Sequence, residues 1–274
     1  MGQLILTKLK EEGHSVTGID RKLLYGAVEN LAVEIRNTDV IINLAGAPIL
    51  QFWTKKRKKT IYDSRVITTR NLVHAINTLP EIEQPNKFIS ASAIGIYQSG
   101  KLHDETSTDF DNGFAGIVLQ DWEEATELLP DSIQKNIVRI GLTIGKEALI
   151  IKLLKLPFQL GLGAKIGDGS QPFPFVHTND VVKAMLWLVN KHEKTGIFNA
   201  TAPENISNKE FSKTFAKVLK RPMFLSIPKF IFRLILGEAS VMITESPQVE
   251  PKNLLENGFQ FDYPTITAAM NEIV

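Results

Sequence analysis

One tyrosine and one lysine have a spacing that could transfer protons. Tyr97 and Lys101 are four residues apart. On a helix this spacing puts both side chains on one face, where the cation would favour ionisation of the phenol. However, the pair directly follows a predicted strand and encloses Ser99 and Gly100, which are typical of a loop. We therefore expect the spacing to be a coincidence.

The first twenty residues are predicted to form a helix and a short strand. Apolar residues at helical spacing place the helix over residues 2–12, Gly13 ends it, and residues 15–20 are predicted to be a strand that ends at Asp20. A helix, a glycine, a strand and an acidic residue form the second half of a dinucleotide-binding βαβ unit. The first half of such a unit is an apolar strand and a glycine-rich turn.

Strands and helices alternate over the first 200 residues, which predicts a parallel sheet covered by helices on both faces. Strands are predicted at 39–46, 87–92, 136–140 and 197–200, and helices at 54–79, at 116–129 and within 176–191, where Asn179 or Asp180 could be the N-cap. The pattern changes near Ser207. A helix over 208–219 is followed by a proline-marked apolar segment to Leu236 and by a last helix from Thr265.

Composition excludes several classes of protein. Of the 274 residues 43% are hydrophobic and 22% are charged, and the net charge of +1 indicates neither a nucleic-acid nor a membrane partner. The absence of cysteine excludes disulfides and thiolate catalysis, and the five histidines show no metal-ligand spacing, so we expect no metal site. No signal peptide is visible, and no apolar stretch reaches the about 20 residues that a membrane span needs. We expect a soluble, cytoplasmic protein.

A run of basic residues from Lys55 to Lys59 could be read as a phosphate or nucleic-acid patch. No aromatic residues interleave with it, so we expect a solvated helix face.

Short motifs follow one another in order over almost the whole chain. They are Gly13-His14, Asn43 to Pro48, Trp53-Thr54, Asp63-Ser64-Arg65, Thr69-Arg70, Ser90 to Gly95 with Tyr97, Trp122-Glu123, Arg139 to Gly141 with Gly145, Pro157-Phe158, Leu160 to Gly163, Phe175 to His177 with Asp180, Asn199-Ala200, Ala202-Pro203, Arg221-Pro222, Leu236 to Glu238, Gly258-Phe259, Phe261 and Tyr263-Pro264. With these motifs the sequence resembles the atypical extended short-chain dehydrogenases/reductases called epimerase family proteins, whose C-terminal end is a small domain of unknown function.

The resemblance implies an α/β fold. Residues 1–200 would form a Rossmann-type doubly wound parallel sheet that binds the cofactor, and residues 221–270 a small substrate-side lobe packed on it. Members of the group begin with an apolar strand and a glycine-rich turn that lead into a pair like Met1-Gly2. Gly2 would then be the last glycine of the fingerprint, and the first strand would be missing. A misassigned start codon or a truncated chain would explain this, and so would a genuine shortening that impairs cofactor binding.

The resemblance also implies a nicotinamide cofactor and the residues that bind it. Asp20 would favour NAD by accepting from a ribose hydroxyl, whereas Arg21 would favour NADP by pairing with a 2′-phosphate. Arg is usual at this place in the resembling group, so we expect NADP, with NAD as the alternative. The other implied cofactor-binding residues follow two strands and the first glycine turn, and they are Gly2, Asn43, Leu44, Ala45, Gly46, Ser90 and Ala91.

Standard proton-transfer chemistry is in doubt for this chain. Reductases of the superfamily use a serine, a tyrosine and a lysine, with the last two on a helix. Phe114 and Val118 stand at those helical positions here, and neither can transfer a proton. Ser92 and Tyr97 remain as candidate catalytic hydroxyls, with Tyr97 as the loop tyrosine that lines the cleft in the resembling group.

Five further residues follow predicted strands or lie on predicted helices near these candidates. Glu123 and His177 could take part in chemistry, but we expect His177 to be a structural histidine tied to Asp180 or to the backbone. Trp122 is expected in the core or the cleft wall. Asp104 and Glu105 are expected on the surface.

The resemblance implies an NADP(H)-binding oxidoreductase or epimerase-like protein that acts on an unidentified small substrate. A sugar nucleotide is suggested by fold analogy alone. One alternative is a non-catalytic NADP(H)-binding sensor or scaffold, and another is a true sugar-nucleotide epimerase with tightly held NAD. A homodimer could form through the helices at 54–79 and 116–129, as members of the superfamily often do.

Overall fold

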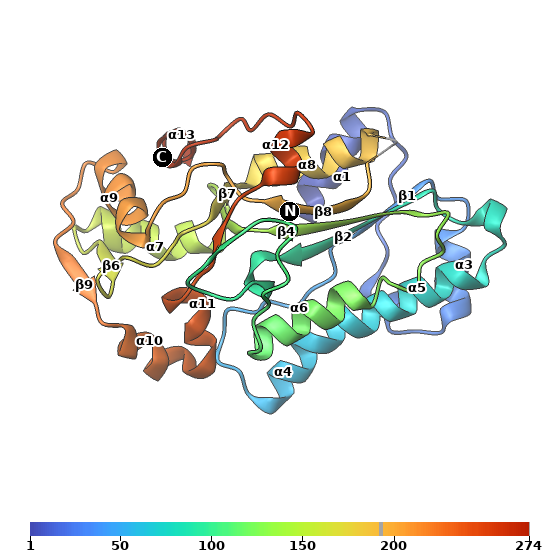
Figure 1. Cartoon of the computed structure of the whole chain (residues 1–274), viewed down its shortest axis with the longest axis horizontal. Coiled ribbons are helices and arrows are strands. Elements are labelled where there is room, and N and C mark those ends of the chain that lie inside the picture. Colours follow the sequence, from blue (N-terminus) through green and yellow to red (C-terminus); the bar gives the residue numbers. More distant parts are fainter. Residues whose placement is uncertain (192–193, 274) are drawn as a thin grey trace.

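Four parallel strands form the centre of the molecule. The computed structural model describes residues 1–191 and 194–273. Its main sheet has the strand order β1-β2-β4-β8 (Figure 1), with β1 at Val40–Asn43, β2 at Lys87–Ala93, β4 at Gln134–Ile140 and β8 at Gly196–Ala200. Because all neighbours in the sheet pair in parallel, their carboxyl ends meet at one edge.

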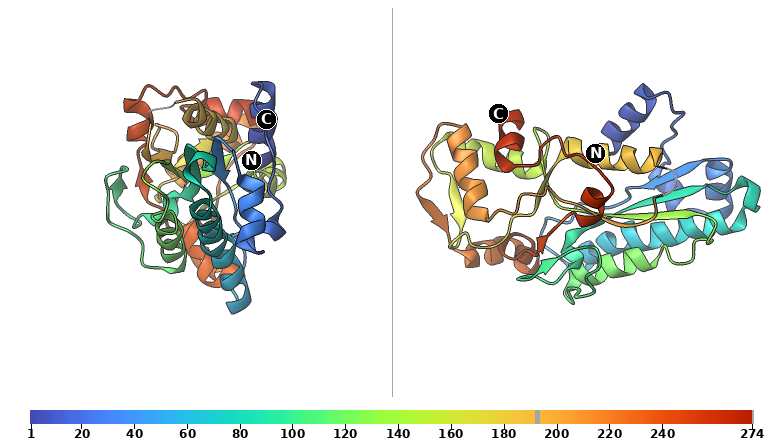
Figure 2. Two further views of the ribbon diagram at one scale, coloured as in Figure 1. Left: turned by 90° about the vertical axis from the view of Figure 1, so that its right-hand side faces the viewer. Right: turned by 45° about the horizontal axis from the view of Figure 1, so that its top comes forward.

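Helices cover both faces of this sheet, as the sequence predicted. One face carries α8 (Thr178–Asn190) with α1 (Gly2–Glu11) beside it (Figure 2). The other face carries α3 (Val28–Ile35), α5 (Thr68–Thr78) and α6 (Phe114–Glu124). Two apolar clusters fill the layers. The first includes Ile5, Leu9, Ile89, Val138 and Met185, and the second includes Leu31, Ile35, Leu72, Ile76 and Phe88.

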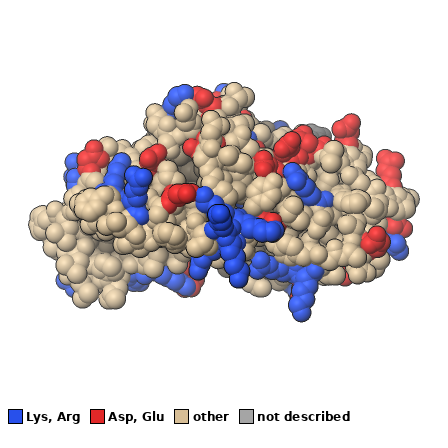
Figure 3. Space-filling model, turned by 90° about the horizontal axis from the view of Figure 1, so that it is seen from below, with Lys and Arg blue, Asp and Glu red and all other residues tan. Residues whose placement is uncertain are grey.

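The long helix predicted at 54–79 is present, but it is not uniform. It consists of α4 (Lys55–Tyr62), a π-helical turn η1 (Asp63–Ile67) and α5. The basic residues of α4 lie at the surface, and Figure 3 shows Lys and Arg side chains gathered on the side of the molecule where α4 lies. The expectation of a solvated helix face is confirmed, and Lys58 additionally pairs with Glu238.

The prediction of a strand over residues 15–20 was wrong. This segment is extended, and Val16 and Ile19 are half-buried against the two clusters. Among the described residues, however, no strand pairs with it, and the sheet ends at β1. A strand is defined by the neighbour that accepts its backbone hydrogen bonds, so the sequence pattern alone does not make one. The short helix α2 (Arg21–Leu24) follows directly.

A second apolar core lies beyond the carboxyl edge of the sheet, at the left of Figure 1. It is enclosed by two small parallel sheets, β5 (Leu142–Ile144) with β7 (Phe175–His177) and β6 (Ala164–Ile166) with β9 (Leu225–Ile227). The helices around it are α7 (Leu149–Gln159), α9 (Asn208–Val218) and α13 (Ile266–Ile273). Phe158, Phe211, Phe215 and Met270 are buried in this core.

The C-terminal segment returns to the main sheet before it ends. After α10 (Lys229–Leu236), the 3-10 turn η4 (Gly237–Ser240) and α11 (Val241–Thr244), the strand β10 (Gln248–Val249) pairs with β3 (Leu102–His103). The helix α12 (Lys252–Glu256) then packs beside β8. The remaining short turns are η2 (Glu81–Glu83) and η3 (Ile94–Ile96).

Two local expectations need correction or support. The N-cap of α8 is His177, whose ring accepts from Asn179 N–H at 3.3 Å, so the expected cap at Asn179 or Asp180 was wrong. Tyr97 and Lys101 lie outside any helix, which confirms that their spacing is a coincidence.

In the described part of the chain, no helix is both long and apolar enough to cross a bilayer, and no group of acidic or histidine side chains could hold a metal ion.

Candidate functional site

Three polar side chains form one row across the main sheet near its carboxyl edge. Ser92 on β2 is in register with Arg139 on β4, and Arg139 is in register with Asn199 on β8. Register partners on neighbouring strands point to the same face of a sheet. The row therefore brings together a hydroxyl, a guanidinium and an amide that are far apart in the sequence.

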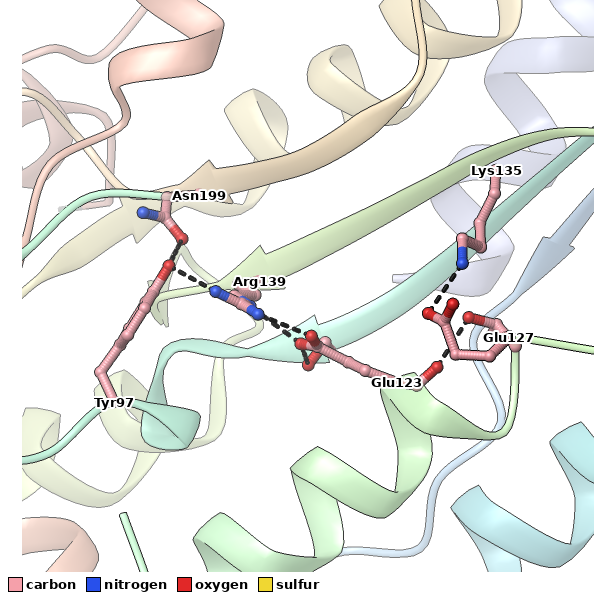
Figure 4. Close-up of polar contacts among 8 residues, drawn as sticks. Tyr97, Glu123, Glu127, Lys135, Arg139 and Asn199 are labelled. Atoms are coloured by element: carbon pink, nitrogen blue, oxygen red, sulfur yellow. Dashed lines mark hydrogen bonds and ion pairs between the residues drawn. The ribbon is translucent and has the colours of Figure 1, made fainter. Parts of the chain in front are cut away.

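Arg139 is the centre of a hydrogen-bond network that Figure 4 shows. Its side chain is only 2% exposed, and its charge is matched by Glu123 of α6. Arg139 Nε donates to Glu123 Oε1 at 2.9 Å and Nη2 donates to Oε2 at 2.7 Å. The third nitrogen, Nη1, donates to Tyr97 Oη at 2.8 Å. This bidentate geometry satisfies a charge that would otherwise be costly to bury.

The two hydroxyls predicted to be catalytic belong to this same network. Ser92 Oγ donates to Glu123 Oε1 at 2.6 Å, and Tyr97 Oη donates to Asn199 Oδ1 at 2.8 Å. The structure therefore links Ser92, Glu123, Arg139, Tyr97 and Asn199 into one chain of hydrogen bonds.

The resemblance implied that Tyr97 is the loop tyrosine that lines the cleft, and in this structure its side chain is enclosed. Tyr97 is 1% exposed, and its ring stacks on His103 at 4.8 Å between centroids. Burial raises the pKa of Tyr97, and the Arg139 guanidinium at its oxygen opposes that rise. Glu123 keeps 14% of its side chain exposed, so it is the member of the network that reaches the solvent side.

A second polar cluster joins the end of β1 to the middle of β2. Asn43 Nδ2 donates to Thr69 Oγ1 at 2.8 Å and to Ser90 Oγ at 3.3 Å, and Asn43 Oδ1 accepts from Ala45 N–H. Trp122 Nε1 donates to the same Thr69 oxygen at 2.9 Å. Trp122 is buried, which confirms its predicted place in the core or wall. The cluster fixes the start of the loop after β1.

The loop that follows β1 is held from two sides. On one side, Ala47 N–H donates to Ser64 Oγ at 2.9 Å. On the other, Gly2 at the start of α1 lies beside Leu44, because a Cβ on Gly2 would be 3.8 Å from Leu44 Cδ1. Gly2, Leu44 and the small residues after Leu44 were all predicted to bind the cofactor, and the structure brings Gly2 to the loop.

Asp20 and Arg21 lie apart from these clusters. The Asp20 carboxylate caps α2 by accepting from Lys22 N–H at 2.7 Å, and the exposed Arg21 guanidinium lies 5.8 Å from the Tyr25 ring centre. In the described chain, neither residue is hydrogen-bonded to another predicted cofactor-binding residue. Ala91 is buried in the middle of β2.

His177 is buried and tied to the backbone, which confirms one of the two expected arrangements. The ring is 2% exposed, Nδ1 accepts from Asn179 N–H at 3.3 Å, and Nε2 lies 3.1 Å from Glu272 Oε2 on α13. Asp180, the other expected partner, instead accepts from Asp262 N–H and Tyr263 N–H at 2.8 Å and 3.0 Å. Both contacts attach the end of the chain to α8.

Glu105 was expected on the surface, and this prediction was wrong. It is 7% exposed and accepts backbone hydrogen bonds from Asn199 at 2.8 Å and from Asn253 at 3.2 Å. Asp104 next to it is half-buried and contacts Thr106 and Lys252. No local pattern predicts these contacts, because both partners of Glu105 lie far along the chain.

Comparison with known proteins supports the resemblance. Residues 1–113 match the NAD dependent epimerase/dehydratase family, and residues 227–273 match a domain of unknown function, DUF1731. Epimerase family protein SDR39U1 of Homo sapiens is 31% identical over 283 residues, which cover 100% of this chain and 96% of that protein. Epimerase family protein YfhF of Bacillus subtilis is 30% identical over 289 residues, which cover 100% of this chain and 94% of that protein.

The same similarity extends to three dimensions. The crystal structure of human SDR39U1 (isoform 2) with NADPH aligns with a TM-score of 0.92, covers 99% of this chain and 95% of that chain, and is 31% identical in sequence. The chain therefore belongs to the epimerase family proteins, with an NAD dependent epimerase/dehydratase segment at its beginning and a DUF1731 domain at its end.

Proposed function

We propose that this protein binds NADP(H) and acts as an oxidoreductase or epimerase-like enzyme on a small substrate. The observation that carries the proposal is the alignment of 99% of the chain with a relative crystallised with NADPH. A parallel sheet of this kind holds its ligands beyond the carboxyl ends of its strands. Both polar clusters, around Arg139 and around Asn43, lie at that edge.

The residues at the start of α1 fit a dinucleotide. The first turn of α1 has no side-chain cap, so its N–H groups are available to a phosphate. Gly2 and the loop after Leu44 consist of small residues, which allow a close approach of the ligand. The residues present therefore fit the cofactor, and Gly2, Asn43, Leu44, Ala45 and Gly46 are the ones that we propose to hold it.

The choice between NADP and NAD depends on Asp20 and Arg21. The Asp20 carboxylate is already engaged by Lys22 N–H, whereas the Arg21 guanidinium is exposed at the start of α2. An arginine is the residue that pairs with a 2′-phosphate. We propose NADP(H) as the preferred form and NAD(H) as the weaker one.

We propose that Ser92 and the residues hydrogen-bonded to it, directly or through Glu123, carry out the chemistry. The bound cofactor would supply or accept a hydride. Ser92 Oγ, held by Glu123, is the hydroxyl proposed to meet the substrate oxygen. Tyr97, enclosed beneath the sheet edge, would act through Arg139 as a positioning residue, because its Oη keeps the guanidinium aligned with Glu123.

A titration with NADPH, followed by nicotinamide fluorescence with NADH alongside, tests the binding proposal. We expect tighter binding of NADPH, and the Arg21→Ala variant should lose this preference. Consumption of NADPH with a panel of carbonyl compounds and sugar nucleotides tests the reaction. Ser92→Ala should abolish any turnover, whereas the matched control Ser132→Ala, at an exposed position, should not.

A second candidate function is a non-catalytic NADP(H) sensor or scaffold. Phe114 and Val118 on α6 carry no proton-transferring group, and Tyr97 is enclosed. These observations favour a protein that binds the cofactor without using it. Binding of NADPH with no turnover on the whole panel would support this second candidate and contradict the first.

A further inference from the structure

Arg65 occupies an unusual place in the long helix. It lies in the π-helical turn η1, and π turns within helices are frequent at functional sites. Its guanidinium lies 5.4 Å from the Trp122 ring centre. It also lies directly against Gly46, where a Cβ would be 3.1 Å from Arg65 Cζ. Gly46 therefore leaves the space that the guanidinium occupies.

The charge of Arg65 has no counter-charge in the described chain. Nη1 donates to Ile61 O at 3.2 Å and Nη2 donates to Ala47 O at 3.1 Å, but within residues 1–191 and 194–273 it forms no ion pair. Arg139, the other arginine at this edge, has both carboxylate oxygens of Glu123. Burial lowers the pKa of Arg65, and no acidic group opposes that effect.

A half-buried cation without a carboxylate is costly unless something else supplies the negative charge. A guanidinium has five N–H donors, and the two carbonyls use only two of them. The remaining donors are suited to a planar or tetrahedral oxyanion. A ligand is the natural source of such a group at this position.

Arg65 lies against the loop after β1 and against the second polar cluster. It contacts Gly46 and Ala47 in that loop, and its guanidinium lies over the ring of Trp122, which donates to Thr69 beside Asn43. The loop and the cluster lie at the carboxyl edge where ligands bind in sheets of this type. An anion at Arg65 would thus lie beside the loop proposed to hold the cofactor.

We propose that Arg65 is an anion-binding residue of this site and that it receives a phosphate or carboxylate group of a bound ligand. The proposal deepens the proposed function and rests on it for the identity of the ligand. Two sources share this chemistry, a phosphate of the dinucleotide and an acidic group of the substrate. The test below separates them.

The first experiment uses the wild-type protein and needs no variant. Phenylglyoxal modifies accessible arginines, and mass mapping of peptides gives the rate at Arg65 with and without NADPH, inorganic pyrophosphate or malonate. Exposed Arg57 on α4 is the control in the same digest. We expect at least one of the three anions to slow the modification of Arg65 and to leave Arg57 unchanged.

The pattern of protection identifies the source. Protection by NADPH supports a cofactor phosphate as the anion. Protection by pyrophosphate or malonate that persists when NADPH is already bound supports an acidic group of the substrate. Equal modification of Arg65 under all conditions would overturn the proposal. Failure of NADPH to bind would contradict the proposed function, whereas protection by pyrophosphate would still support the role of Arg65.

Variants of Arg65 measure how much this side chain contributes to the affinity for the anion. Calorimetric titration with whichever anion protects Arg65 should show about tenfold weaker binding for Arg65→Gln, as expected for the loss of charge-assisted hydrogen bonds. Arg65→Lys should recover part of the affinity because it restores the charge, and Arg57→Gln should bind like wild type. If Arg65 only fastens Ala47, Arg65→Lys and Arg65→Gln should bind the anion equally, and that result would contradict the proposal.

Discussion

Arg139 shows how strongly a single residue can depend on its partners. Its charge lies within the sheet and is satisfied by Glu123 and by Tyr97 Oη. Removing one partner of a buried ion pair leaves the other charge without compensation, which costs far more than the pair itself contributes. The network therefore constrains substitution at every one of its positions.

Glu123→Ala should strongly destabilise the protein. Because Arg139 would stay buried without its counter-charge, we expect the free energy of unfolding to fall by about 3–5 kcal/mol in urea denaturation. Glu127→Ala is the matched control four residues further along, since Glu127 pairs with Lys135 at the surface (Figure 4). That variant should lose at most about 1 kcal/mol. Similar losses for both variants would contradict this account of the network.

Tyr97→Phe isolates the contribution of one hydroxyl. The ring would keep its stacking on His103, but Arg139 Nη1 and Asn199 Oδ1 would each lose a partner. We expect a loss of about 1–3 kcal/mol in stability. If Tyr97 positions Arg139, kcat should fall while KM changes little, and a loss of stability with unchanged kcat would show a purely structural role.

Sequence reasoning named Ser92, Tyr97 and Glu123 as candidates but assigned no role to Arg139 and Asn199, which the structure links to them. Ser92 and Tyr97 were found because hydroxyls near strand ends are recognisable by type and position. Arg139 was visible only as a charge among Ile137, Val138 and Ile140 in the second half of its strand, which is a signal for a buried partner. Asn199 could not be assigned, because the register that aligns it with Arg139 is set by tertiary pairing.

At the scale of elements, the spacing of apolar residues predicted the helices and strands that depend on local sequence. The helices at α5, α6 and α8 and the strands of the main sheet follow from apolar spacing. The π turn η1 was not predicted, because it depends on contacts such as Ser64 with Ala47. The failed strand at residues 15–20 has the same cause, since a strand needs a neighbour that no local pattern reveals.

The attachment of α8 to the end of the chain should give the protein a characteristic pH dependence. Burial raises the pKa of Asp180, although Asp262 N–H and Tyr263 N–H oppose this. A raised folded-state pKa contributes stability that is complete below the ordinary value of 3.8 and is lost as the pH rises through the folded-state value. As the pH rises from 3.8 to the folded-state pKa of Asp180, the stability of Asp180→Asn relative to wild type should therefore increase.

Urea midpoints measured at a series of pH values check this sign. Asp168→Asn is the control, because hydrogen bonds from Ser170 lower the pKa of exposed Asp168. Its contribution is present above 3.8 and is lost as the pH falls, so relative to wild type Asp168→Asn should gain stability at acidic pH. Parallel pH profiles for wild type and Asp180→Asn would contradict the assignment of Asp180.

At the scale of the whole molecule, the C-terminal segment is part of the folded unit. Glu105 accepts from Asn199 on β8 and from Asn253 on α12, and Asn253 Nδ2 donates back to Ile197 O at 2.8 Å. Pairing of β10 with β3 and the contact of Asp180 with Tyr263 add two further attachments. The sheet and the segment therefore share buried polar groups that neither could satisfy alone.

These shared groups predict cooperative unfolding. Trp53 shares an apolar cluster with Ala239, and the Trp187 ring lies 6.0 Å from that of Phe259, so tryptophan fluorescence reports on the attachment of the C-terminal segment, whereas far-UV circular dichroism reports on the whole chain. We expect the two urea transitions of wild type to coincide. In Glu105→Ala, the N–H groups of Asn199 and Asn253 lose their acceptor, which costs about 1–3 kcal/mol and should separate the two curves.

The control for this separation is Asp109→Ala, which removes an exposed pair with Lys101 and should leave the transitions coincident. The fluorescence of Glu105→Ala should then begin to change before the circular dichroism does, because the C-terminal segment would move away from Trp53 and Trp187 while the main sheet persists. Separate transitions already in wild type would mean that the C-terminal segment detaches on its own and that Glu105 does not couple it to the sheet. Coincident transitions in Glu105→Ala would mean that the remaining attachments through β10 and Asp180 are sufficient on their own.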